Sequence, residues 1–366
     1  MSPPRGVQVR SLGQDTDYWI HIEPGAALEL GGVLGSLRPE GRVAIIADRT
    51  VAGLHAPAVR AGLGRPSDLY VFDPGEASKS VETWASLSES LLADHHDRGS
   101  VVVALGGGVT GDLAGFVAAT LMRGVPVVQV PTTLLAMIDA SVGGKTGVNT
   151  LQGKNLLGAF HAPAAVVIDP RLLETLPVGL RAQGLVEAVK HGAIRSVAHL
   201  ERIEDAMDAL LAAEPEVTAA VVAESVALKA EVVSADEREH GLRAILNFGH
   251  TLGHALEHLS GYRMGHGEAV AQGMVLEARL GEAIGVSDPG TAERLAGALR
   301  RLGLPIDGRL RYAAESVVAR TRIDKKGRAG RARYVLLARP GMVAPAEGWL
   351  HDVPEERVVE TLQVQR

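Results

Sequence analysis

Five short, mainly apolar runs in the first half of the chain constrain its fold more than any other feature. They cover residues 43–47, 69–72, 101–105, 125–130 and 166–168. Such near-continuous hydrophobicity predicts strands buried on both faces, as in parallel sheets. Between them lie helical stretches such as 80–94, where Trp84, Leu87 and Leu91 recur at helical spacing. The alternation predicts βαβ units and an α/β domain.

The second half of the chain has a different pattern. After residue 170 the sequence is typical of helices to about residue 320, and the longest predicted helix, 217–234, carries an apolar stripe that includes Val221 and Val226. A late run, 334–337, is predicted as one strand of a small hairpin. A length of 366 residues favours two domains. We expect an α/β domain over 1–171 and an all-α domain over 172–366.

Composition excludes several classes of function. A net charge of -6 and a pI near 6.1 argue against a broad basic face for nucleic acid. There is no cysteine, which excludes disulfides, thiolate nucleophiles and Cys-ligated zinc, so a metal site must use His, Asp or Glu. No apolar run approaches a membrane span or the core of a signal peptide. We therefore expect a soluble, cytoplasmic protein with no membrane partner.

A glycine-rich loop over 106–112 follows one predicted strand and precedes a helix. Its backbone N–H groups could bind a pyrophosphate, and its spacing satisfies G-x-G-x-x-G. The usual acid about 20 residues later is missing, but Asp48 at the end of an earlier strand could contact a ribose. A tight turn without a ligand is the alternative. Together, the loop and Asp48 favour a nucleotide bound in a non-standard way.

A second polar, glycine-rich segment covers 130–149 and is followed by Lys154 and Asn155. Gly144, Lys145 and Thr146 are similar to part of a phosphate-binding loop, although that loop's first glycine would fall at Asp139. A phosphate bound by Lys145 and Lys154 is one interpretation. A solvated surface loop is the other.

A histidine cluster over 250–266 predicts a metal site. His250, His254 and His258 recur every four residues, and His266 follows. Two histidines four residues apart on a helix can bind one metal, with a carboxylate completing a site that keeps an open position. Spacing alone favours His250 and His254 and does not identify the carboxylate. Isolated histidines satisfied by the core or by solvent are the alternative.

Charged residues lie on both sides of this cluster in the sequence. Glu187, Lys190 and His191 share one helical face, a pattern that is ordinarily a surface salt-bridge network. An arginine such as Arg243 suits a bidentate carboxylate, and a lysine such as Lys229 suits phosphate. The basic run at 324–328 is by default solvated.

Taken in order, these motifs resemble the 3-dehydroquinate synthase family over about 43–337. The resemblance is carried by Pro74-Gly75-Glu76 with Lys79, Gly106 to Val109 with Asp112, Pro131-Thr132-Thr133, Asp139 to Lys145, Gly153-Lys154-Asn155, Glu187 to Lys190, and Asn247 to His254. It implies a Rossmann-like NAD domain and a helical domain holding zinc or cobalt, with the active site between them. It also implies Glu187, His250 and His266 as metal ligands. His254 would lie near the leaving phosphate and is the runner-up ligand.

The resemblance assigns the remaining site residues by position. It implies NAD contacts from Asp48, Glu76, Lys79, Gly107, Gly108, Val109, Asp112, Thr132, Thr133, Asp139, Lys145, Lys154 and Thr175. It implies catalytic or substrate contacts from Arg123, Lys145, Asn155, Lys190, Lys229, Arg243, Asn247, His254 and Lys325, the last preferred to Lys326. Leu121 and Phe248 depart from the aromatic and the tyrosine common in the family. Neither position carries chemistry there.

The resemblance implies conversion of 3-deoxy-D-arabino-heptulosonate 7-phosphate to 3-dehydroquinate and phosphate, in the shikimate pathway. The steps would be transient oxidation by NAD, β-elimination of phosphate, re-reduction and aldol cyclisation, in a homodimer. Lys145, Asn155, Lys190 and His254 would hold the phosphate. Lys229 and Arg243 would hold the substrate carboxylate.

Three other functions stay open at this point. Sugar phosphate cyclases whose substrates lack a carboxylate would not need Lys229 and Arg243, but a cyclase for the amino analogue in secondary metabolism would keep the same site. A metal-dependent polyol or alcohol dehydrogenase would consume NAD and leave the lysines unexplained. A non-enzymatic binding relative would have lost catalytic positions, and no expected one is lost.

Overall fold

The computed structural model describes residues 6–9, 17–236, 241–306, 311–322 and 332–364. Contacts divide the chain into two compact units. Unit 1 comprises Met1–Pro177 and Ala213–Ser234, and unit 2 comprises Val178–Ala212 and Ala235–Arg366. None of the helices in the described part of the chain is long and apolar enough to cross a membrane.

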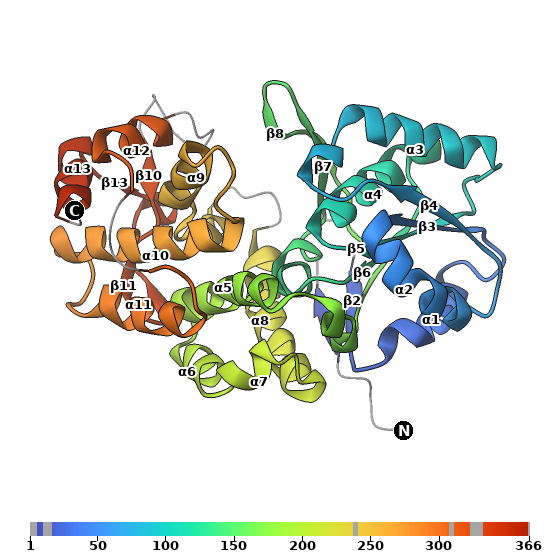
Figure 1. Cartoon of the computed structure of the whole chain (residues 1–366), viewed down its shortest axis with the longest axis horizontal. Helices are drawn as coiled ribbons and strands as arrows, with labels where there is room; N and C mark the ends of the chain where they lie inside the picture. Colours follow the sequence, from blue (N-terminus) through green and yellow to red (C-terminus); the bar gives the residue numbers. More distant parts are fainter. Residues whose placement is uncertain (1–5, 10–16, 237–240, 307–310, 323–331, 365–366) are drawn as a thin grey trace. The chain divides into compact units, whose positions relative to one another are not determined.

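Unit 1 is built on a seven-stranded sheet in the order β1-β2-β9-β6-β5-β3-β4 (Figure 1). The strands are β1 Gly6–Val9, β2 Tyr18–Ile22, β3 Val43–Asp48, β4 Ser67–Phe72, β5 Val101–Gly106, β6 Val127–Pro131 and β9 Ala165–Ile168. All neighbours pair in parallel except β1 with β2. The five predicted strands are present. The strands β1 and β2 had no sequence prediction.

Helices cover both faces of this sheet, because alternate side chains of each strand point to opposite faces and both sets are apolar. The helices are α1 Leu30–Leu37, α2 Arg49–Gly62, α3 Val81–Ala93 and α4 Gly108–Thr120. Along β3, Val43 and Ile45 pack in one core with α1 and α2, whereas Ala44 and Ile46 pack in the opposite core with α3 and α4. The result is a doubly wound α/β layer structure, whose ligands ordinarily bind at the carboxyl ends of the strands.

A β-hairpin forms from the end of the polar, glycine-rich segment 130–149 and the residues after it, where a solvated surface loop was one of two interpretations. It pairs β7 Lys145–Thr150 with β8 Gly153–Phe160, and β7 packs on α4. A Cβ on Gly147 would lie 2.5 Å from the Leu157 carbonyl oxygen, and one on Gly158 would lie 2.1 Å from the Thr146 carbonyl oxygen. Here the glycines let two strands approach closely, so glycine content was a poor sign of a loop.

Unit 1 also contains shorter turns and one late helix. These are η1 Ala26–Glu29, η2 Glu76–Ser78, η3 Leu121–Arg123, the π-helical turn η4 Ala136–Ala140, η5 Pro170–Thr175 and α8 Pro215–Ala235. The sequence placed one boundary near residue 172. Contacts place the first division near residue 177 and group most of α8 with unit 1, because a helix distant in sequence packs back there.

Unit 2 is helical, with two small two-stranded sheets. Its helices are α5 Val178–Arg195, α6 Val197–Asp205, α7 Met207–Leu211, α9 His250–Leu259, α10 His266–Ala283, α11 Thr291–Arg301, α12 Ala314–Thr321 and α13 Glu355–Gln363, with the turns η6 Leu242–Asn247 and η7 Glu347–Trp349. The strand pairs are β10 Arg333–Tyr334 with β13 His351–Asp352, and β11 Leu337–Arg339 with β12 Met342–Val343.

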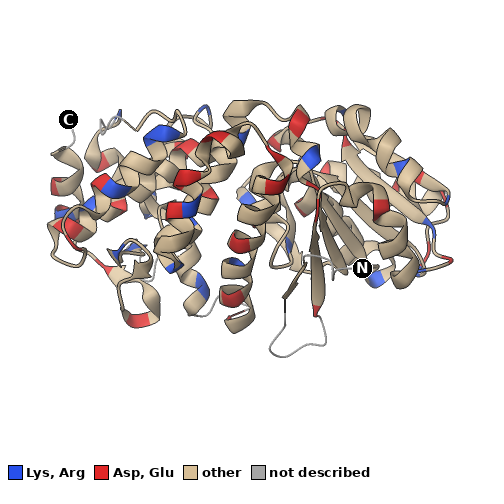
Figure 2. Cartoon of the chain, turned by 90° about the horizontal axis from the view of Figure 1, so that it is seen from below, with Lys and Arg blue, Asp and Glu red and all other residues tan. Residues whose placement is uncertain are grey.

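The central element of unit 2 is α10. It contacts α5, α9, α11 and α13, and α9 and α11 lie on either side of it in Figure 1. Its burial is correspondingly high, with Val270, Met274 and Ala278 fully enclosed. Acidic and basic residues are interspersed over the helices in the view of Figure 2.

Candidate active site

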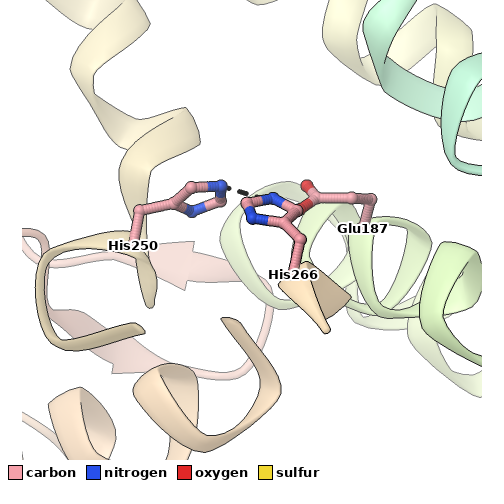
Figure 3. A group of neighbouring side chains, drawn as sticks. All are labelled: Glu187, His250 and His266. Carbon is pink, nitrogen blue, oxygen red and sulfur yellow. Dashed lines mark ion pairs between the residues drawn. The ribbon is translucent and has the colours of Figure 1, made fainter. Parts of the chain in front are cut away.

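Three side chains from three helices of unit 2 converge to form a candidate metal centre (Figure 3). Glu187 lies in α5, His250 begins α9 and His266 begins α10. One potential ligand atom from each lies within 4.8 Å of the others. Glu187 Oε1 is 3.6 Å from His250 Nε2 and 3.8 Å from His266 Nε2. The group joins residues that are far apart in the sequence.

The Glu187 carboxylate needs positive charge because it is buried. The residue is 1% exposed, so its two oxygens are almost completely removed from water. Lys190, also buried, forms an ion pair with it one helical turn away. Burying an ionised carboxylate is strongly unfavourable unless it is paired or binds a metal. One carboxylate and two imidazoles match the donors of a catalytic zinc-type site, so these residues fit a divalent metal ion.

Glycines on both sides of His266 explain how it reaches Glu187. A Cβ on Gly265 would lie 2.2 Å from the Gln183 side chain, and one on Gly267 would lie 2.4 Å from the Gln183 carbonyl oxygen. Gln183 is one turn before Glu187 on α5, so both lie on the same face. Close contact between the start of α10 and this face of α5 therefore places His266 beside Glu187.

Glycines also bring the start of α9 onto α10. A Cβ on Gly249 would lie 2.4 Å from the Met274 side chain, and one on Gly253 would lie 2.8 Å from the Ala269 carbonyl oxygen. Gly249 has a φ of +80°, a backbone conformation that favours glycine. This packing holds His250 in place.

Electrostatics differ between the two histidines. Burial, followed by the charge of Lys190, holds the pKa of His250 well below its ordinary value. Burial also lowers the pKa of His266, but its hydrogen bond to Glu257 and the charges of Glu187 and Glu257 outweigh this and raise it. His266 Nδ1 is 3.4 Å from Glu257 Oε2, which leaves Nε2 facing Glu187. A carboxylate behind a histidine is the usual outer partner of a metal ligand.

His254 belongs to the same cluster without being part of the Glu187 group. Its ring centroid is 5.2 Å from that of His250 and 5.9 Å from that of His266. With Glu257 and His266 it forms a second group that could hold an ion. His258, the third histidine of the periodic series, packs its ring on Tyr262 and lies outside both groups.

In unit 1, the residues that the family resemblance assigned to NAD gather mainly after the carboxyl ends of parallel strands. Asp48 ends β3, the glycine loop ends β5, and Thr132 and Thr133 follow β6. Asp48 Oδ1 accepts the N–H groups of Thr50 and Val51, and so caps α2. The residue preceding α4 is Gly107, which has no side chain to cap the helix. The first-turn N–H groups of α4 therefore fit a phosphate.

Two ion pairs join other residues of the predicted site in unit 1. Lys79 is buried and pairs with Asp112. Burial raises the pKa of Asp112, and Lys79 offsets only part of that effect. Lys229 of α8 lies 2.7 Å from Asp139 Oδ1 and also donates to the Asp139 carbonyl oxygen. A predicted substrate residue, Lys229, thus contacts a predicted NAD residue.

Asn149 connects predicted site residues, although sequence analysis gave it no role. Its side chain donates to Glu76 Oε1 at 2.8 Å and accepts the Asn155 N–H at 2.9 Å. Its own N–H donates to the Lys79 carbonyl oxygen at 2.8 Å. Asn155 has a φ of +55°, a strained conformation that this bond helps to fix. The only sequence signal was its position in the polar segment 130–149.

The other predicted residues are distributed as follows. Lys145 and Lys154 are exposed on the hairpin, and Thr175 Oγ1 is 2.9 Å from His55 Nε2. Arg243 is buried, and its backbone N–H donates a hydrogen bond to the Asp236 carboxylate. The side-chain amide of Asn247 donates to the Ala244 carbonyl oxygen. Lys325 and Lys326 lie outside the described residues.

Arg123 stands apart from the glycine loop. Gly107 precedes the first residue of α4, whereas Arg123 lies in the turn η3 that follows the last residue of α4 and precedes β6. Met122 and Arg123 both have positive φ values, 51° and 69°. Such strained non-glycine conformations often occur at functional positions.

Comparison with known proteins identifies the family. Residues 69–181 match the family described as 3-dehydroquinate synthase N-terminal, and residues 184–327 match 3-dehydroquinate synthase C-terminal. A 3-dehydroquinate synthase from Symbiobacterium thermophilum is 48% identical over 337 residues, 91% of this chain and 94% of the relative. The chain belongs to the 3-dehydroquinate synthase family.

Solved structures extend the comparison to the 3-dehydroquinate synthase fold. A 2-deoxy-scyllo-inosose synthase complexed with carbaglucose-6-phosphate, NAD+ and Co2+ has a TM-score of 0.90 at 25% identity, covering 98% of this chain and 99% of that one. A 2-epi-5-epi-valiolone synthase from Streptomyces hygroscopicus, with NAD+ and Zn2+ bound, has a TM-score of 0.85 at 27% identity, covering 97% and 98%. The expected fold of an α/β domain followed by a helical region is confirmed.

Gly267→Ala tests how the 3-dehydroquinate synthase metal group is assembled. The new Cβ would push against the Gln183 backbone and displace His266 from Glu187, so we expect about 10- to 100-fold weaker zinc binding, as for loss of an outer-shell partner. Competition with a chromophoric chelator measures this. Gly297→Ala in α11 is the control, because no atom lies within 4 Å of its new Cβ. Unchanged zinc affinity in Gly267→Ala would contradict the packing argument.

Proposed function

We propose that this chain is a phosphate-eliminating cyclase that converts 3-deoxy-D-arabino-heptulosonate 7-phosphate to 3-dehydroquinate, using NAD and a divalent metal. The observation that carries the proposal is the convergence of Glu187, His250 and His266 in a chain 48% identical to a 3-dehydroquinate synthase. The bound metal would supply a Lewis acid and NAD a reversible hydride acceptor.

Residues of unit 2 would bind the substrate phosphate and support its departure. Lys190 lies beside Glu187, so a charged amine is available next to the metal group. His254 adds a partly exposed imidazole whose ring centroid is 5.2 Å from that of His250. We propose that both donate hydrogen bonds to the phosphate oxygens, which stabilises charge on the leaving group.

Residues of unit 1 would bind and orient NAD. We propose that the N–H groups after Gly107 contact the pyrophosphate and that Asp48 contacts a ribose. The buried ion pair of Lys79 and Asp112 fixes two charged groups near the start of α4, the helix that follows Gly107. Asn149 would hold Glu76 and Asn155 in position through its two side-chain hydrogen bonds. These assignments extend the residue matches of the family to contacts found in the structure.

We propose a substrate that carries a carboxylate, because the chain has basic side chains that suit one. The 2-deoxy-scyllo-inosose synthase structure holds carbaglucose-6-phosphate, a ligand without a carboxylate. This chain carries Arg243 and Lys229, which we propose bind the keto-acid carboxylate. The Lys229 ammonium forms an ion pair with the Asp139 carboxylate. The substrate carboxylate would therefore displace the Asp139 carboxylate or share the ammonium with it.

Turnover with catalytic NAD tests the proposed reaction. Metal-loaded protein with the keto-acid phosphate should release phosphate and 3-dehydroquinate in equal amounts, with no lasting NADH absorbance, because the hydride returns to the product. Treatment with a chelator should abolish turnover, and added Zn2+ or Co2+ should restore it. Net NADH formation from a polyol, with no phosphate release from the keto acid, would instead support a dehydrogenase.

Single substitutions test the proposed roles of the histidine cluster. Glu187→Gln and His250→Ala should lose stoichiometric zinc, because each removes a ligand. His254→Ala should retain zinc but lose about 10²- to 10³-fold in kcat, the range for loss of one hydrogen-bond donor to developing negative charge. Metal analysis after gel filtration and steady-state kinetics measure the two effects. Loss of zinc from His254→Ala with retention in Glu187→Gln would favour the alternative ligand set, and His258→Ala is the matched control.

We propose a cytoplasmic homodimer on the strength of the family resemblance and one exposed surface. The β7–β8 hairpin exposes Leu156, Leu157 and Phe160, the last 61% exposed. Leu156 and Phe160 are four residues apart on β8, so they point to one face of the strand, and exposed apolar side chains that share a face can mark an interface. Light scattering should give twice the chain mass, and Leu156→Lys with Phe160→Lys should give monomers. A monomeric unsubstituted protein at micromolar concentration would contradict the proposal.

A further inference from the structure

Glu277 is a fully buried carboxylate in the middle of α10 that the proposed reaction does not use. Its Oε2 accepts the Gly249 N–H at 2.7 Å, and its Oε1 accepts the Leu252 N–H at 3.2 Å. These donors lie on either side of His250. Both oxygens are thus directed at the first turn of α9, the helix that carries His250 and His254.

The start of α9 needs such a partner. The first N–H groups of a helix have no acceptor within the helix, and a side chain at the N-cap commonly supplies one. Here the N-cap is Gly249, which has no side chain. Glu277 supplies the missing acceptor from a neighbouring helix, at a helix N-terminus where oxygen acceptors are favoured by the partial positive charge of the N–H groups.

This arrangement is unfavourable for the carboxyl group itself. Burial raises the pKa of Glu277 to about 8, although the N–H groups of Gly249, Leu252 and Thr251 each lower it. An apolar side chain would fill the same core position without that penalty. Packing alone therefore gives no reason for an acid here.

Close packing makes the connection between Glu277 and His250 stiff. A Cβ on Gly273 of α10 would lie 1.9 Å from the Gly249 carbonyl oxygen. Gly273 is one turn before Glu277, so α10 contacts the start of α9 at two successive turns of the same face. A shift of the first turn of α9 would move His250 relative to Glu187 and His266.

We propose that Glu277 is a positioning residue for the metal centre, holding the first turn of α9 through its two backbone hydrogen bonds so that His250 meets Glu187 and His266. The inference rests on the metal site of the proposed function. It does not depend on the identity of the substrate, because metal binding can be measured without turnover.

A second glutamate on α10 provides a matched control. Glu282 Oε1 accepts the Ala292 N–H at 2.9 Å, in the first turn of α11. The N-cap of α11 is also a left-handed glycine, Gly290, with a φ of +89°. Glu282 therefore caps a helix in the same manner, but α11 carries none of the metal-group residues.

The test compares Glu277→Gln, Glu277→Met and Glu282→Gln in the full-length chain. Gln retains one acceptor oxygen and Met none, so zinc affinity should fall in that order, reaching about 10- to 100-fold below the unsubstituted protein. Chelator competition measures affinity, and chemical denaturation of the metal-free proteins measures stability. Hydrogen exchange of the metal-free proteins should be faster at residues 249–252 in the Glu277 variants. Glu282→Gln should keep its zinc affinity, with faster exchange confined to the start of α11.

Two results would overturn the inference. If the Glu277 variants lose stability but bind zinc within about twofold of the unsubstituted protein, Glu277 is merely structural. If Glu282→Gln weakens zinc binding equally, the effect is general to the fold. Should Glu277→Met fail to fold, the near-isosteric Glu277→Gln decides alone. An unsubstituted protein that binds zinc at Glu187 but lacks turnover would sink the proposed function and leave this inference standing.

Discussion

The burial of the Glu187 carboxylate is the constraint on which unit 2 depends. Moving such a charge out of water is unfavourable unless cations surround it. The chain supplies one cation, Lys190 on the same helix, and places imidazoles from the starts of two other helices beside the carboxylate. A divalent metal would complete the compensation. Much of the surrounding packing serves to bring α5, α9 and α10 to one point.

Close helix contact is how that convergence is reached. Glycines flank His266, and another precedes His250, where a Cβ would collide with α5 or α10. Close contact of this kind transmits small shifts, so the position of each histidine depends on the backbone of a neighbouring helix. Glu277 then adds directional hydrogen bonds to the start of α9. The geometry of the metal-ligating side chains is therefore set by how the helices pack.

Unit 1 uses a different arrangement for its polar groups. Parallel strands bring their carboxyl ends to one edge, where a loop without side chains and an uncapped helix start are suited to phosphate. The pairs Lys79 with Asp112 and Lys229 with Asp139 fix charged groups within the same unit. The nucleotide-type edge therefore belongs to unit 1, and the histidine cluster belongs to unit 2.

The sequence by itself determined the features that depend on local pattern. Continuous aliphatic runs located β3 to β6 and β9, helical spacing located α3, and i,i+4 spacing identified the histidine cluster. Family resemblance supplied Glu187 and His266, which periodicity could not connect with His250. Only the tertiary structure showed the β7–β8 hairpin, the return of α8 to unit 1, and the hydrogen bonds of Asn149 and Glu277. The physical reason is that periodicity reports which face of an element is buried, whereas these contacts join residues that meet only when distant elements pack.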